Sequence, residues 1–129
     1  MRSLLLLIAL AGCAATGGEP GGREADAFAR ELAGRTAGEP ESCVAAIQNQ
    51  PLRIVDRRTI AYERGDTIWV NRLERDCPGL RPLNTLIVEV HGSQYCRGDR
   101  VRGLETGATI PGPICILRDF VPYRQGGTR

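Results

Sequence analysis

The chain has 129 residues, enough for one small domain with a tail and too few for a second sizeable hydrophobic core. All 17 basic residues are arginine, and with 15 acidic residues they give a net charge of +2. The absence of lysine clusters and an aromatic content of only 5% argue against nucleic acid as a partner.

The first 12 residues have the layout of a secretion signal. Arg2 and the free amino terminus provide the positive start, and residues 4–11 form a short apolar core. That core is shorter than the roughly 20 apolar residues that a membrane-spanning helix needs. We therefore expect residues 1–12 to be a signal peptide that is removed.

The segment Leu10-Ala11-Gly12-Cys13 closes this signal and resembles the lipobox of bacterial lipoproteins. The resemblance implies that a diacylglycerol is attached to the thiol of Cys13, which becomes the first residue of the mature chain. Two or three acyl chains form an effectively permanent anchor, because each buried methylene contributes about 0.8 kcal/mol. Ala14 follows the cysteine, which in this family implies sorting to the outer membrane, facing the periplasm. The alternative is an ordinary secretion signal in which Cys13 is incidental.

Residues 13–42 have the composition of a flexible linker that begins at the lipidated cysteine. They are rich in glycine and alanine, contain two Glu-Pro pairs, and lack the apolar mass for a core of their own. Residues 25–37 can form one short helix, with Phe28 and Leu32 four apart on one face. We expect this helix to pack loosely or not at all, and the linker to hold the domain clear of the lipid headgroups.

From Cys43 the pattern changes to short β-branched and aromatic runs separated by turn residues, which is typical of an antiparallel β protein. We expect one β domain over residues 43–123 and a C-terminal tail over residues 124–129. Residues 43–129 carry thirteen arginines and nine acidic residues (net +4), whereas residues 14–42 carry three and six (net −3). A mildly basic domain can bind an anionic envelope polymer, although a solvated surface with internal ion pairs is the simpler explanation.

The clearest structural unit is a β-hairpin, in which residues 59–63 and 67–73 are joined by a turn that contains Gly65. Residues 85–91 alternate with a period of two, which predicts a strand with one buried face. Further short strands are predicted at residues 52–55, 94–96, 100–104 and 114–121, whereas 110–113 are too rich in proline and glycine for a central strand. Together these runs predict a mainly β fold, a small antiparallel barrel or sandwich.

Four stretches of this region, RTIAYERGDTIWVNRL, CPGL, EVHGSQYC and CILRDF, are similar to a family of small Gram-negative envelope proteins known as a domain of unknown function. The similarity covers roughly residues 43–123. It implies one folded unit with cysteines at these positions, and it implies no activity and no catalytic residues.

Four cysteines remain after Cys13, namely Cys43, Cys77, Cys96 and Cys115. An even number in a small exported domain indicates two disulfides. Because the close pairs typical of zinc sites are missing, we expect no metal and no cofactor. We predict that Cys77 joins Cys96, since they flank a loop and a strand whose ends should lie close together. Cys43 and Cys115 would then tie the start of the domain to its last strand.

The candidates for ligand binding are Trp69, Tyr62, Arg57 and Arg72. Trp69 and Tyr62 are placed across the first hairpin, where an aromatic pair would stabilise the sheet. If the rings are exposed instead, they form a platform for stacking sugars, and nearby arginines favour a glycan- or lipopolysaccharide-binding module. Burial of the two rings decides between these alternatives.

His91 is the only histidine, and it shares a predicted strand face with Glu89, which could orient it as a proton acceptor. Ser93 lies two residues further on, but partners of a catalytic triad usually converge from separate segments. We therefore expect no catalytic residues, with an envelope-polymer hydrolase as the alternative. The sequence predicts a lipid-anchored, non-enzymatic structural or interaction module that binds the bilayer through Cys13 and, in addition, another envelope protein or an anionic polymer.

Overall fold

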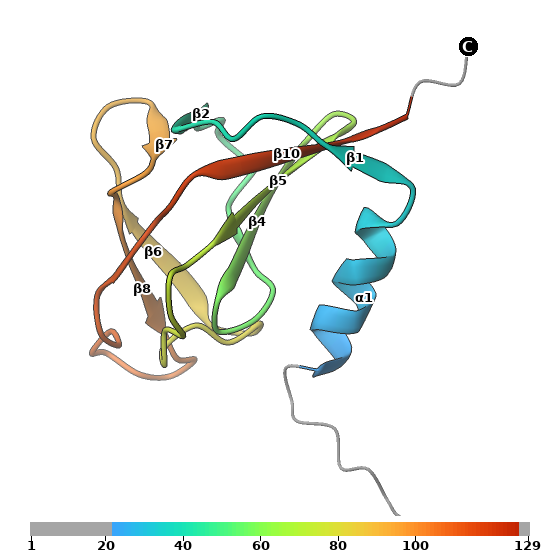
Figure 1. Cartoon of the computed structure of the whole chain (residues 1–129). Coiled ribbons are helices and arrows are strands. Elements are labelled where there is room, and N and C mark those ends of the chain that lie inside the picture. Colours follow the sequence, from blue (N-terminus) through green and yellow to red (C-terminus); the bar gives the residue numbers. More distant parts are fainter. Residues whose placement is uncertain (1–21, 127–129) are drawn as a thin grey trace, which may run out of the picture.

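The computed structural model describes residues 22–126, so the predicted signal peptide and Cys13 lie outside the described residues. Within residues 22–126 the chain forms one helix and ten strands (Figure 1). These elements are α1 (Gly22–Leu32), β1 (Arg35–Ala37), β2 (Cys43–Ala45), β3 (Arg53–Ile54), β4 (Thr59–Arg64), β5 (Thr67–Arg72), β6 (Thr85–Glu89), β7 (Gln94–Cys96), β8 (Arg100–Leu104), β9 (Cys115–Ile116) and β10 (Phe120–Gln125). The mainly β, antiparallel class predicted from the sequence is confirmed. No helix of the described residues is long and apolar enough to cross a membrane.

The main sheet has five strands in the order β1-β10-β5-β4-β3. Its centre contains the predicted hairpin, in which Tyr62 on β4 lies opposite Trp69 on β5. Gly65 in the turn has a φ of 56°, a conformation that glycine adopts without steric cost. The hairpin prediction is therefore confirmed in both its strands and its turn.

Two smaller sheets, β2-β7 and β6-β8-β9, cover one face of the main sheet. Their inward side chains join those of β4, β5 and β10 in one core, which includes Tyr62, Trp69, Val101, Leu117 and Phe120. Each of these side chains is at most 5% exposed. The period-two prediction for residues 85–91 is confirmed within β6, where Leu86 and Val88 pack against this core, whereas Val90 lies beyond the strand and is exposed.

Helix α1 covers the opposite face of the main sheet, where Phe28 packs in a second core cluster with Ala61, Ile68 and Val70. Phe28 is only 4% exposed. The prediction that the helix packs loosely or not at all is therefore wrong. The reason is that both faces of the central strands are apolar, and a sheet with two apolar faces needs a second cover.

The domain boundary predicted at Cys43 is wrong as well, because residues 22–42 are part of the folded domain. After α1 the chain forms β1, which pairs with β10, and Glu41 then bridges to Phe120. At the other end β10 extends to Gln125, into the predicted tail.

The two predicted disulfides are present, but the predicted pairing is wrong: Cys43 joins Cys96, and Cys77 joins Cys115. Cys43 and Cys96 lie opposite each other in the register of β2 and β7. The prediction assumed that the strand at residues 85–91 pairs with its neighbours in sequence. Instead β6 pairs with β8, which carries the chain away from β7 and leaves Cys77 beside β9.

The strand predicted at residues 114–121 is divided in two. β9 pairs with β8 in the three-stranded sheet, whereas β10 lies in the main sheet between β1 and β5. The short connection between β9 and β10 therefore carries the chain from one sheet to the other, and Leu117 on it is fully buried.

Candidate functional site

The two aromatic candidates form a buried pair rather than an exposed platform. Tyr62 and Trp69 are 1% and 5% exposed, and their ring centroids are 5.8 Å apart. The Tyr62 hydroxyl donates a 2.8 Å hydrogen bond to the carbonyl of Ala45, and the Trp69 indole N–H donates to the carboxylate of Glu41. The guanidinium of Arg64 covers the Trp69 ring at 5.2 Å. The cross-strand pair is confirmed, and the rings are not available for stacking on a sugar.

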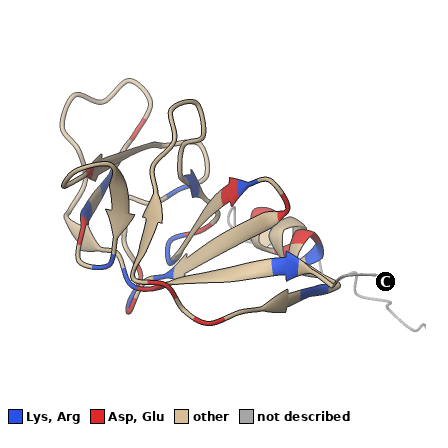
Figure 2. Cartoon of the chain, turned by 90° about the horizontal axis from the view of Figure 1, so that it is seen from above, with Lys and Arg blue, Asp and Glu red and all other residues tan. Residues whose placement is uncertain are grey.

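The two arginine candidates are exposed and lie at the same end of the β4–β5 hairpin. Arg57 precedes β4, where its carbonyl accepts a 2.8 Å hydrogen bond from the N–H of Cys77. Arg72 ends β5 and lines a hollow of about 210 Å³ with Arg118 and Asp119. Figure 2 shows basic and acidic residues interspersed over the strands and loops. The structure therefore separates these arginines from the buried rings and does not join the four candidates in one site.

Among the described residues, His91 forms no hydrogen bond or ion pair with Glu89. It lies in the turn after β6, with its Nδ1 3.4 Å from Oδ1 of Asp99, whereas the carboxylate of Glu89 lies 3.8 Å from Arg100. Asp99 is buried, and its other oxygen accepts a 2.8 Å hydrogen bond from the N–H of Cys96. The Glu89–His91 arrangement considered from the sequence is therefore absent, and the carboxylate of Asp99 holds a turn together.

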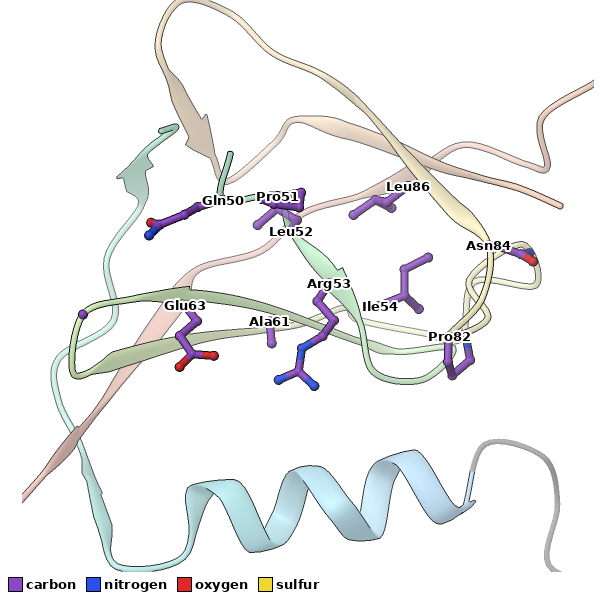
Figure 3. Close-up of a pocket in the computed structure, with 11 residues that line it drawn as sticks. Gln50, Pro51, Leu52, Arg53, Ile54, Ala61, Glu63, Pro82, Asn84 and Leu86 are labelled. Atoms are coloured by element: carbon purple, nitrogen blue, oxygen red, sulfur yellow. The ribbon is translucent and has the colours of Figure 1, made fainter. Parts of the chain in front are cut away.

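A groove of about 610 Å³ runs between the β3–β4 edge of the main sheet and β6 (Figure 3). We call it the edge groove, and it is lined by Gln50, Pro51, Leu52, Arg53, Ile54, Ala61, Glu63, Gly65, Pro82, Asn84 and Leu86. Sequence patterns do not indicate this groove, because three separate segments form it and none of them carries a motif. The one sequence feature that marks this place is Gln50-Pro51, because a proline directly before β3 limits how far that strand can extend.

The strands β3 and β6 border the edge groove, and each is an edge strand of its own sheet. The N–H of Val55 donates a 2.9 Å hydrogen bond to the carbonyl of Thr59, so the backbone groups of Thr59 point toward β3. Because these groups alternate in direction along a strand, those of Ala61 and Glu63 point the same way. Ala61 pairs with Arg53 at the start of β3, and the ladder between β3 and β4 does not continue to Glu63. Among the described residues, no backbone group bonds to the N–H and carbonyl of Glu63 on this side.

The charged residues of the edge groove are Arg53 and Glu63. Arg53 is already engaged: its Nη2 lies 2.7 Å from the Glu31 carboxylate, and its guanidinium lies 5.5 Å from the centre of the Phe28 ring. Gln50 contributes a buried Oε1 atom that has no hydrogen-bond partner in the described part of the chain. The lining therefore offers backbone hydrogen bonds and apolar contacts rather than a nucleophile held beside a base.

Tyr95 on β7 is half-buried and packs against the aromatic pair. Its ring lies edge-on to that of Tyr62, with the centroids 5.8 Å apart. Burial, with a smaller contribution from Tyr62, raises the pKa of the Tyr95 hydroxyl above its usual value. Because Tyr95 packs against the core, we assign it to stability rather than to a site.

No protein-family model, curated protein or solved structure matches the chain. Residues 22–126 contain no group of three or more His, Cys, Asp or Glu side chains that could hold a metal ion. The functional interpretation therefore depends on the edge groove and on the sequence features of the amino-terminal segment.

Proposed function

We propose that this protein is a lipid-anchored module of the bacterial envelope that binds an extended segment of another envelope protein in the edge groove. The observation that carries this proposal is the open backbone of Glu63, beyond the first residue of β3. A bound segment would continue the line of β3 and pair with β4, which is the mode of recognition called strand addition.

The composition of the groove supports an extended peptide as the ligand. In strand addition, main-chain hydrogen bonds supply affinity and pockets for alternate side chains supply specificity. Half-buried Leu86 offers such a contact beside the open backbone, and Leu52 and Ile54, which are buried in the core, also line the groove. We therefore expect a segment in which apolar and polar side chains alternate.

The anchor is proposed from the lipobox-like segment that ends at Cys13. In the sequence, eight residues separate Cys13 from Gly22, where the first described element, α1, begins. A module held so close to the bilayer would meet partners that are themselves in or near the membrane.

The groove is tested with a photo-crosslinking amino acid placed at Glu63 in growing cells. The matched control is the same amino acid at Glu24, an exposed position on α1. We expect position 63 to crosslink one defined segment of an envelope protein and position 24 not to do so. A synthetic peptide of that segment should then slow hydrogen exchange of the Glu63 amide. Identical crosslinking at both positions, or a peptide that leaves this amide unprotected, would contradict the proposal.

The anchor is tested separately with Cys13→Ser, which should abolish labelling by a fatty-acid analogue. Ala15→Ser, which keeps the cysteine, is the control and should be labelled like the natural chain. Labelling of Cys13→Ser at an unchanged level would refute the anchor and leave the groove proposal intact.

A further inference from the structure

We propose that one end of the domain contacts the same bilayer that holds the anchor, through Leu83 and Ile110. Among the described large apolar residues these two are the most exposed, at 89% and 81%. Leu83 lies in the loop between β5 and β6, and Ile110 lies in the loop between β8 and β9. We call these two loops the apolar tip. The inference rests on the proposed lipid anchor.

The two loops of the apolar tip are fixed to each other. Gly79 in the first loop packs so closely against Gly103 of β8 that a Cβ added at Gly103 would overlap the Gly79 carbonyl, and a Cβ added at Gly112 would lie 3.2 Å from the Gly79 Cα. The N–H of Gly112 donates a 2.8 Å hydrogen bond to the carbonyl of Gly103, and the Cys77–Cys115 disulfide joins the first loop to the start of β9, where the second loop ends. Leu83 and Ile110 therefore lie on loops that are joined to each other rather than on two independent loops.

The apolar tip lies at the end of the domain where the folded chain begins. In Figure 1 the first turn of α1 and both loops of the tip lie at the bottom of the view, and α1 runs upward from there. From Cys13 to Gly22 a fully extended chain spans only about 30 Å. The tip is thus the end that the anchor holds toward the bilayer.

The chemistry of the tip favours an apolar contact over an electrostatic one. Its loops carry Arg75 and Arg81 but also Glu74, Asp76 and Glu105, so neither sign predominates. Leucine and isoleucine gain free energy when they enter the boundary between headgroups and acyl chains, and this gain does not require anionic lipid. We therefore expect the contact to form on a zwitterionic bilayer and to resist salt.

The test uses the lipidated full-length protein in phosphatidylcholine vesicles, with and without brominated acyl chains that quench tryptophan emission. Leu83→Trp and Ile110→Trp each place a reporter at the tip. Val90→Trp is the control, because Val90 is 44% exposed and lies in the connection from β6 to β7, which in Figure 1 is at the opposite end of β6 from the tip. The natural Trp69 is buried and gives the same background in all three variants.

We expect brominated lipid to reduce emission from Leu83→Trp and Ile110→Trp, at low and high salt, and to leave Val90→Trp unchanged. If brominated lipid changes the emission of all three variants equally, or of none, the proposed bilayer contact is wrong. The mass of each purified protein reports separately whether Cys13 is acylated. An unacylated protein refutes the anchor, whereas an acylated protein without quenching at the tip refutes only this inference.

Discussion

The side chain of Asn71 forms two hydrogen bonds with the backbone of Arg118. Its Nδ2 donates to the Arg118 carbonyl at 2.6 Å, and its Oδ1 accepts from the Arg118 N–H at 2.9 Å. Asn71 is fully buried on β5, and Arg118 lies where the chain passes from β9 to β10. The amide therefore pairs with the chain as a neighbouring strand would, at the point where the two sheets meet.

Asn71→Leu should destabilise the domain strongly, because it leaves the N–H and carbonyl of Arg118 without their partner. Each buried polar group left unsatisfied costs about 1–3 kcal/mol. The free energy of unfolding in urea measures the loss. Asn84→Leu is the control, since half-buried Asn84 donates one 2.9 Å hydrogen bond to the carbonyl of Gly79. A loss no larger than that of the control would contradict this role of Asn71.

Phe28→Ala should detach α1 from the sheet, because Phe28 is the helix residue buried in the second core cluster. Truncation of a buried phenylalanine typically costs about 3–5 kcal/mol. We expect faster hydrogen exchange in residues 22–32 together with lower stability. Leu32→Ala, at a half-buried position, should have a smaller effect. Rapid exchange of these residues in the natural protein would restore the linker interpretation.

Gly103→Ala should disrupt the junction of the two loops, because an added Cβ would overlap the carbonyl of Gly79. Overpacking of this kind costs about 1–3 kcal/mol. The clashing atom is the backbone carbonyl oxygen of Gly79, which cannot move away as a flexible side chain can. Gly22→Ala is the control, since nothing lies within 4 Å of its added Cβ. Thermal unfolding of both variants gives the comparison. Similar melting temperatures would show that the close approach is dispensable.

Alkaline pH should destabilise the domain through Tyr95. Its raised pKa means that the folded protein holds the phenolic proton more tightly than the unfolded chain does. The stability that this tighter proton binding gives the folded state is fully present below the unfolded pKa of about 10. It is lost as the pH rises through the folded pKa of Tyr95. The free energy of unfolding should therefore fall at high pH, and Tyr95→Phe should reduce that fall. Tyr123→Phe, on the helix-covered face, is the control and should preserve it.

Local patterns predicted the elements whose geometry is set within a few residues. The β4–β5 hairpin follows from two alternating runs and a glycine turn, and β6 follows from its period of two. The exchange of disulfide partners and the docking of α1 depend on which strands become neighbours. That order is decided by tertiary packing, because β10 enters the main sheet and β6 turns away from β7.

The candidate site was the least predictable part for the same reason. The aromatic pair Tyr62 and Trp69 was located correctly across the hairpin, but its burial depends on the two smaller sheets that cover it. The edge groove exists because β3 stops after two residues and β6 lies beside it. Neither fact can be predicted from the residue types of a single strand.

The position of β10 sets the order in which the molecule can assemble. β10 is the last strand of the described chain, yet it lies between β1 and β5 and contacts both. A chain that emerges from its amino terminus can form the β4–β5 hairpin early, but it cannot close the main sheet until Phe120–Gln125 arrive. Until then the edges of β1 and β5 stay unpaired, and unpaired edges promote aggregation. Newly made chains of this protein should therefore depend on a holding chaperone until the carboxy-terminal strand is available.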